Sequence, residues 1–130
     1  MPNYRRSFHA GGTYFFTVNL SRQDHSDLLT RHIDLFRESV RKVRRKHPFD
    51  IHAWVVLPDH LHCVIKLPEE DPDFPRRWQL IKAGFSRALP KEGLKSSESK
   101  RKGERGIWQR RFWEHLIRDA VSYTHLTLPT

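Results

Sequence analysis

The sequence predicts an α+β fold in which two helices pack on one face of a four-stranded antiparallel sheet. Apolar residues follow strand periodicity in some segments and helix periodicity in others, and the order along the chain is strand, helix, hairpin, helix, strand. No segment repeats internally. This order is typical of a ferredoxin-like sandwich. A chain of 130 residues is long enough for one such domain with a buried core.

The first half of the chain supplies a strand and an amphipathic helix. Aromatic and β-branched residues after Gly11 and Gly12 predict a strand over residues 14–20. A polar loop is expected next, followed by a helix over residues 31–46 that ends before Pro48. The apolar residues of this helix recur at steps of three and four: Ile33, Phe36, Val40 and Val43. Its other side is strongly basic.

Two further strands form a hairpin, over residues 51–57 and 60–67, because only Pro58 and Asp59 separate them. Successive side chains of a strand point to opposite faces. One face of the second hairpin strand is therefore apolar and expected in the core: Leu61, Cys63, Ile65 and Leu67. The other face carries the remaining side chains: His60, His62, Val64 and Lys66.

The last part of the chain holds a second helix and a fourth strand. Asp73 is expected to cap that helix, whose apolar residues are Trp78, Ile81, Phe85 and Ala88. Residues 90–106 are rich in Lys, Arg, Glu and Ser and predict a flexible, solvated loop. Aromatic and apolar residues over 107–117 predict the fourth strand.

The charge balance indicates an anionic partner. Lys and Arg number 24 against 15 acidic residues, a net charge of +9. We expect nucleic acid rather than a membrane, because no long apolar segment or amphipathic anchor is present. Cys63 is the one cysteine, so no disulfide can form within the chain, which suits a reducing compartment. A start without the apolar core of a signal peptide adds to the expectation of a cytoplasmic protein.

His60 and His62 are the candidate metal ligands. Side by side on one strand face, two imidazoles make half a site for a divalent cation, and a third ligand must come from elsewhere. In so basic a chain, a metal beside a phosphodiester is the reaction class that this pair indicates first. The alternative, two surface histidines that ligate nothing, stays open for so short a motif.

The segment over residues 53–63, Ala-Trp-Val-Val-Leu-Pro-Asp-His-Leu-His-Cys, resembles the HUH motif (His, hydrophobe, His) of single-tyrosine transposases. It looks in particular like that of the REP-associated tyrosine transposases, which are linked to repetitive extragenic palindromes in bacterial genomes. Three other stretches match this family in order, over residues 3–6, 11–18 and 107–115. We therefore expect a transposase-like domain over residues 1–119.

The resemblance implies a DNA transposase and endonuclease. In this family the paired histidines, here His60 and His62, bind a divalent cation, with Mg or Mn expected, that orients the scissile phosphate of single-stranded or palindromic hairpin DNA. A tyrosine on a later helix attacks, and an Asn or Gln four residues after it is the usual third ligand. The covalent phosphotyrosine conserves the energy of the phosphodiester for rejoining.

The sequence departs from the family pattern after Asp119. Residues 120–130 are expected to be a non-family tail, artefactual or disordered. Tyr123 is the one tyrosine after the paired histidines, but Thr127 stands where the family has Asn or Gln, so Tyr123 is only a weak candidate nucleophile. We expect the family's nucleophile to be missing and this chain to be inactive.

DNA-binding candidates flank aromatic residues: Arg5, Arg6, Trp108, Arg110 and Arg111. Arginine and aromatic side chains together grip phosphates and stack unpaired bases. The alternative is that the aromatic residues belong to the core and the arginines to a solvated rim. A non-catalytic nucleic-acid-binding module is the second functional hypothesis, and an RNA endonuclease on the same scaffold is a third. The composition is also compatible with a homodimer.

Overall fold

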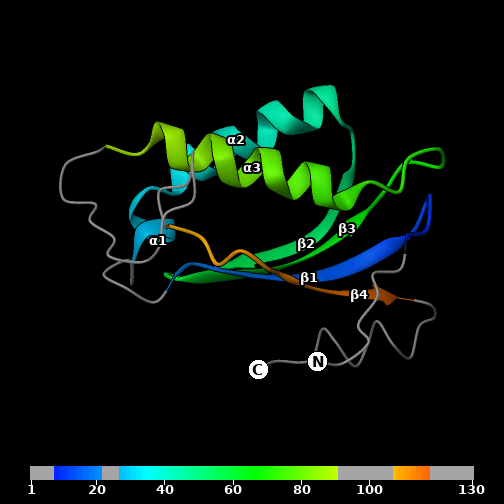
Figure 1. Cartoon of the computed structure of the whole chain (residues 1–130), viewed down its shortest axis with the longest axis horizontal. Coiled ribbons are helices and arrows are strands. Elements are labelled where there is room, and N and C mark those ends of the chain that lie inside the picture. Colours follow the sequence, from blue (N-terminus) through cyan, green and yellow to red (C-terminus); the bar gives the residue numbers. More distant parts are fainter. Residues whose placement is uncertain (1–7, 22–26, 91–106, 118–130) are drawn as a thin grey trace.

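The order of elements follows the predicted one, with one short helix added. The computed structural model describes residues 8–21, 27–90 and 107–117 (Figure 1). Within them, the helices and strands are β1 (Thr13–Asn19), α1 (Leu28–Arg31), α2 (Ile33–Lys46), β2 (Asp50–Val56), β3 (His60–Lys66), α3 (Phe74–Ala88) and β4 (Trp113–Ile117). The predicted loop beyond residue 90 and the tail from Ala120 lie outside the described residues.

The four strands form one sheet in the order β2-β3-β1-β4, and every neighbouring pair is antiparallel. Helices α2 and α3 both lie on one face of this sheet (Figure 1). No described helix covers the other face, which we call the open face. The predicted ferredoxin-like α+β sandwich is thus confirmed.

The core lies between the sheet and the two long helices. Alternate residues of the central strands β1 and β3 point into it and are buried: Tyr14, Phe16, Val18, Leu61, Cys63 and Ile65. The helices contribute Phe36, Val40, Val43, Phe74, Trp78, Ile81 and Phe85. The predicted alternation along β3 is confirmed on the core side, and Leu67 is also buried. Val64, on the opposite side, is buried as well, which alternation alone did not predict.

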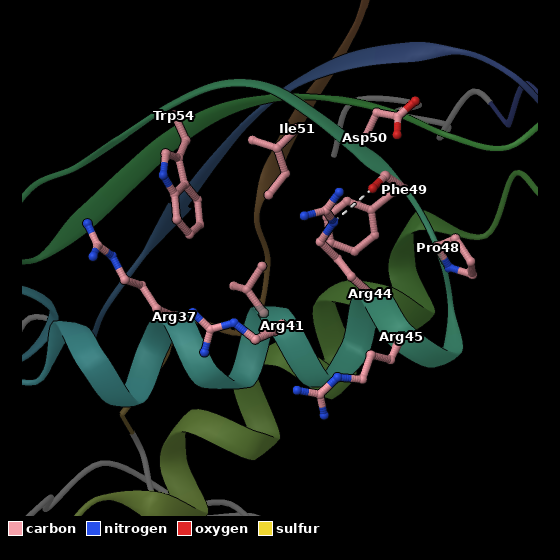
Figure 2. A pocket seen from close by; sticks show the side chains of 10 residues that line it. Arg37, Arg41, Arg44, Arg45, Pro48, Phe49, Asp50, Ile51 and Trp54 are labelled. Atoms are coloured by element: carbon pink, nitrogen blue, oxygen red, sulfur yellow. Dashed lines mark hydrogen bonds between the residues drawn. The ribbon is translucent and has the colours of Figure 1, made fainter.

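Helix α2 separates an apolar side from a basic one, as its spacing predicted. From the basic side, Arg37 and Arg44 reach toward the edge strand β2 (Figure 2). In the last turn of α2, the Nε of Arg44 donates to the carbonyl oxygen of Phe49, at 2.9 Å, and connects the helix to the residue before β2. Leu28 and Leu29, before α2, are buried in the short helix α1, which the sequence did not predict.

The fourth strand is shorter than predicted. The prediction covered residues 107–117, whereas β4 begins at Trp113 and pairs with β1 only as far as Thr17. Of the preceding residues, only Trp108 pairs with the chain beside β1, in an isolated antiparallel bridge to Leu20. Ile107 is buried, and the indole Nε1 of Trp108 donates to the carbonyl of Lys82 on α3, at 3.2 Å. An apolar run reads alike whether it pairs in a sheet or packs beneath a helix, so the pattern overestimated the strand.

Helix α3 begins as predicted, with Asp73 as its N-cap. A carboxylate oxygen of Asp73 accepts a hydrogen bond from the backbone N–H of Arg76, at 3.0 Å. Pro75 occupies the first turn, where a missing N–H costs nothing. The cap and the proline fix where the chain turns from the β3–α3 loop into the helix.

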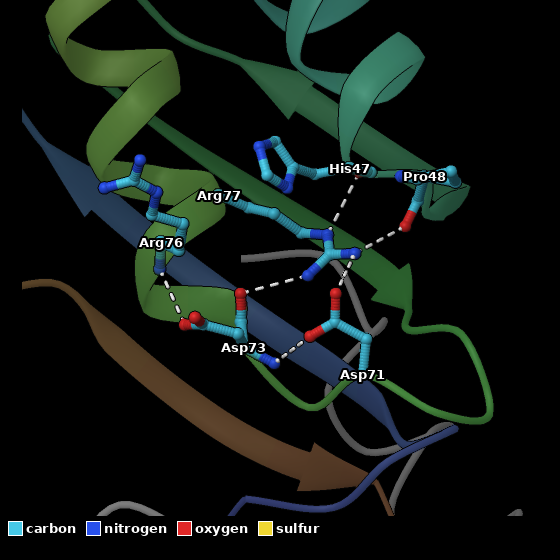
Figure 3. A network of polar contacts seen from close by, with 6 residues as sticks. All are labelled: His47, Pro48, Asp71, Asp73, Arg76 and Arg77. Carbon is cyan, nitrogen blue, oxygen red and sulfur yellow. Dashed lines mark hydrogen bonds and ion pairs between the residues drawn. The ribbon is translucent and has the colours of Figure 1, made fainter.

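A buried arginine joins three segments at this end of the molecule (Figure 3). Arg77 on α3 is 3% exposed, and its guanidinium donates to the carbonyl oxygens of His47, Pro48 and Asp73 at 2.9–3.1 Å. It also pairs with the Asp71 carboxylate at 3.0 Å, and this hydrogen bond is the main cause that lowers the pKa of Asp71. Arg77 thereby holds the α2–β2 connection against the loop that precedes α3.

We predict that Arg77→Met lowers the free energy of unfolding by about 3 kcal/mol or more. Methionine has a similar volume, but it leaves three carbonyls and one carboxylate without their buried donor. Urea unfolding followed by circular dichroism measures the change. Arg76→Met, on the same turn of the helix, is the matched control and is expected to change stability by less than about 0.5 kcal/mol. Equal losses in the two variants would contradict this role for Arg77.

Candidate functional site

His60 and His62 lie at the start of β3 on the open face, as the strand periodicity predicted. Their ring centroids are 5.0 Å apart, with the ring planes nearly perpendicular at 82°. Both side chains are half-buried. In the β1–β3 register Asn19 lies opposite His60, and Thr17 lies opposite His62. Residues directly opposite each other share a face, so these two polar side chains border the histidine pair.

Each histidine has an oxygen partner at its Nδ1 atom. A carboxylate oxygen of Asp59 lies 2.8 Å from Nδ1 of His60, and the hydroxyl oxygen of Thr17 lies 2.9 Å from Nδ1 of His62. An ionised carboxylate only accepts, so the Asp59 contact requires a proton on Nδ1 of His60, and in the neutral ring the lone pair is then on Nε2. Thr17 can accept in the same way. Partners of this kind orient imidazoles that bind metals.

The pKa of His62 is lowered from its usual value. Burial is the larger cause, because it disfavours the charged imidazolium, and the positive charge that His60 can carry adds to it. His62 therefore stays neutral to a lower pH than an exposed histidine. The neutral imidazole is the form that binds a metal ion.

The two histidines amount to half of a metal site. Over residues 8–21, 27–90 and 107–117, no group of three or more His, Cys, Asp or Glu side chains comes together to hold an ion. Cys63 follows His62 directly but points to the core, where burial raises the pKa of its thiol far above the usual range. It is a core residue, as its place in the apolar run predicted.

A row of rings extends from the histidine pair across the open face. Phe15 on β1 stacks against His62 with ring centroids 5.6 Å apart, and it meets the edge of Trp113 on β4 at 5.8 Å. Trp113 in turn stacks on His115 at 5.7 Å. We call these five side chains, His60, His62, Phe15, Trp113 and His115, the ring row. Trp113 is 47% exposed, although a large apolar side chain at this position costs free energy in water.

Sequence reasoning did not assign Phe15, Thr17 or Trp113 to the site. The signal for Phe15 and Thr17 was present, because they alternate with the buried Tyr14 and Phe16 on the same strand. Trp113 gave no such signal. Its neighbours Phe112 and Trp108 are partly buried against the core, and only the point where β4 begins decides which of these aromatic residues faces outward.

The predicted DNA-binding residues lie in different places. Arg110 and Arg111 are exposed in the segment before β4. In the sequence they shortly precede Trp113, which belongs to the ring row. Trp108 packs against Phe36 and Phe85 on the core side, a packing role, and its contact with DNA stays a prediction. Arg5, Arg6 and the weak nucleophile candidate Tyr123 lie outside the described residues.

Comparisons with known proteins place the chain in one family, although no protein-family model matches it. It is 49% identical over 125 residues to the REP-associated tyrosine transposase of Escherichia coli K12, and the match covers 96% of this chain and 67% of the relative. A putative REP-associated tyrosine transposase of Haemophilus influenzae is 46% identical over 120 residues, covering 92% and 68%.

A solved structure of a REP-associated tyrosine transposase bound to a REP hairpin superposes with a TM-score of 0.80 at 47% identity, covering 97% of this chain and 68% of that one. A putative transposase from Deinococcus radiodurans, at 15% identity and a TM-score of 0.59, shows the same fold. The relatives and the shared fold thus define a protein of the transposase class. The chain belongs to the REP-associated tyrosine transposases.

We predict that His60→Ala raises the pKa of His62. The substitution removes the neighbouring positive charge, but burial remains, so the pKa rises without reaching that of an exposed histidine. A pH titration of the imidazole resonances by NMR measures the change. The control is His32→Ala, which removes a histidine at the junction of α1 and α2 and is expected to leave the pKa of His62 unchanged. A fall in the pKa would contradict the repulsion.

Proposed function

We propose that this domain binds single-stranded or hairpin DNA on its open face and presents a phosphate to a divalent cation held by His60 and His62. The single observation that carries the proposal is the pair of Nδ1 contacts to Asp59 and Thr17, since in the neutral rings, with both oxygens accepting, they leave the Nε2 lone pairs for a ligand. The family relative bound to a REP hairpin supports DNA as the partner. The net charge of +9 suits it.

The donor set fits the divalent cation as a half-site. Two neutral imidazoles suit Mn²⁺ better than Mg²⁺, which prefers oxygen ligands and needs more of them. When bound, the cation would neutralise charge on the phosphoryl oxygens and help to orient the phosphate. The chain's own residues do the rest: Asp59 and Thr17 hold the rings, and Phe15 and Trp113 offer faces on which unpaired bases stack.

The nucleophile of the family reaction is not assigned to a described residue. Tyr14 is the one tyrosine that the structure describes, and it is fully buried in the core, where its hydroxyl accepts a hydrogen bond from the backbone N–H of His9 at 3.0 Å. It cannot reach DNA on the open face. Transfer through a tyrosine, with a 5′-phosphotyrosine formed and a 3′-hydroxyl released, is therefore proposed for the family reaction and not for this chain alone.

The second candidate function is a binding module without catalysis. The incomplete ligand set among the described residues favours it. Under this alternative the ring row and the arginines still bind DNA, but the histidines contribute nothing that depends on a metal. The response of DNA binding to Mn²⁺ separates the two functions.

We predict that Mn²⁺ increases the affinity of this protein for a fluorescent hairpin with a single-stranded flank. Anisotropy titrations with and without Mn²⁺ measure the effect. The double variant His60→Ala/His62→Ala is expected to lose the response, because no imidazole remains to hold the ion beside the phosphate. The matched control His32→Ala/His52→Ala also removes two histidines and is expected to keep it.

Each result of this titration decides between the two functions. DNA binding that ignores Mn²⁺ in both the parent and the double variant would establish the non-catalytic module. Absence of DNA binding under all conditions would contradict both functions. A Mn²⁺ response that survives in His60→Ala/His62→Ala would place the ion elsewhere.

We predict that Trp113→Ala weakens binding of the single-stranded flank by about tenfold, because one base–aromatic stack contributes about 1–3 kcal/mol. Stability is expected to change little, since nearly half of the side chain is already exposed. The same anisotropy titration measures the affinity, and thermal unfolding measures the stability. Trp113→Phe keeps an aromatic face and is expected to restore most of the binding. Unchanged affinity in Trp113→Ala would remove the ring row from the DNA interface.

A further inference from the structure

A basic groove runs between helix α2 and the edge strand β2, on the helix side of the sheet and apart from the ring row (Figure 2). Its volume is about 580 Å³. A second hollow of about 410 Å³ adjoins it and shares Arg37 and Trp54 with it. We call the two together the α2–β2 groove. Its α2 side carries four arginines, and its β2 side carries aromatic residues: Arg37, Arg41, Arg44, Arg45, Phe49 and Trp54.

The groove is strongly positive, and few of the described acidic side chains neutralise its arginines. Asp50 is the one acidic side chain that lines it, at the β2 side, and Glu38 pairs with Arg41 from outside. Arg37 and Arg45 form no ion pair with any residue that the structure describes. Four arginines on one helix are often only a solvated surface. Here they border a hollow with an aromatic wall, which a simple solvated face does not explain.

The arginines are spaced for a chain of phosphates. A helix rises 1.5 Å per residue, so steps of four along α2, from Arg37 to Arg41 to Arg45, place successive guanidinium groups roughly 6 Å apart along the axis. Successive phosphates of an extended single strand recur at a comparable spacing. The planar fork of each guanidinium matches two phosphate oxygens.

One arginine is held in place before any ligand binds. The Nε of Arg44 donates to the carbonyl of Phe49, and its guanidinium carbon lies 5.6 Å from the centre of the Phe49 ring. The terminal nitrogens of Arg44 make no hydrogen bond to any described residue. The head group is thus fixed at the groove while both terminal nitrogens stay available for a phosphate.

Trp54 provides an aromatic surface for a base. Its indole stacks on Phe36 of the core with ring centroids 5.6 Å apart and an angle of 29° between the planes, which fixes the ring. Trp54 is half-buried and lines both hollows, so part of the indole still borders the groove. Aromatic side chains beside a basic track are the usual equipment for binding single strands without reading their sequence.

The groove begins one strand away from the histidine pair. Val55 pairs with His62 in the β2–β3 register and is 56% exposed on the open face. The preceding residue on β2, Trp54, points to the opposite side, into the groove (Figure 2). Because β2 is an edge strand, a DNA strand leaving His62 crosses only one inter-strand spacing, about 4.8 Å, before it reaches that edge.

We propose that the α2–β2 groove binds the single-stranded flank of the DNA, with its phosphates on the arginines and a base on Trp54. This inference rests on the proposed function, because the flank continues from the strand held at the histidine pair. It assigns the two surfaces different tasks. The open face holds the phosphate beside the histidines and stacks the unpaired bases next to it, and the groove anchors the single strand beyond those bases.

The test compares a fluorescent hairpin that carries a single-stranded flank with the same hairpin lacking it, in anisotropy titrations at several salt concentrations. We expect Arg37→Gln/Arg41→Gln to weaken binding of the flanked hairpin by about tenfold. The slope of log affinity against log salt should fall by about 1.4, the loss of two single-strand phosphate contacts. Binding of the hairpin without a flank should stay unchanged.

The matched control is Lys42→Gln/Lys46→Gln, which removes two positive charges from the same helix but outside the residues that line the groove. It is expected to reduce the affinity much less and equally for both DNAs. If the two double variants weaken both DNAs equally, the arginines act only through net charge and the groove proposal is overturned.

A second measurement uses the unaltered protein. The flank is synthesised with 5-iododeoxyuridine at each position in turn, irradiated in the complex, and the crosslinked peptide is identified by mass spectrometry. A crosslink at Trp54 supports the groove, whereas crosslinks confined to Phe15 or Trp113 overturn it. The outcome is separate from that of the proposed function, because loss of the Mn²⁺ response in the histidine variant tests the open face alone.

Discussion

The antiparallel pairing of β1 with β3 is the constraint on which the rest of the structure depends. It brings Phe16 opposite Cys63 and, one residue further, Thr17 opposite His62. The first pair enters the core beneath α2 and α3, and the second faces away from them. A register shift of one residue would send the histidines into the core and the aromatic residues into water. Core packing therefore holds the candidate metal site in place, although no site residue belongs to the core.

Polar interactions position one end of the helix layer against this sheet. Arg77 is buried because it satisfies the carbonyls of the α2–β2 connection, which have no strand or helix partner there. The same connection leads into Phe49, at one end of the α2–β2 groove. The site on the open face and the groove on the helix side share strand β2 as their boundary. A single edge strand can thus join two surfaces of different chemistry, one of imidazoles and exposed rings and one of guanidinium groups.

Most of the fold was predicted from local sequence patterns. Helix periodicity located α2 and α3, the proline-containing turn joined β2 to β3, and Asp73 is the helix cap that its position indicated. The predicted start of the fourth strand was wrong, because an apolar and aromatic run does not reveal whether it pairs with a neighbouring strand or packs against a helix. Helix α1 is only four residues long, too short for a periodicity to show. Among site residues, His60 and His62 were predicted, whereas Trp113 depended on the point where β4 begins.

By itself the sequence determined that His60 and His62 share one face of a strand, because the side-chain period of a strand is two. It also determined the strong positive charge and, through its motifs, the family. The apolar residues on the other face of that strand also predicted that the histidines face away from the helices. Only the tertiary structure decided that Thr17, from 45 residues earlier, holds the ring of His62. The ring row and the α2–β2 groove were likewise decided there. Each joins residues of separate elements, and strand register and helix packing act between segments that no local pattern connects.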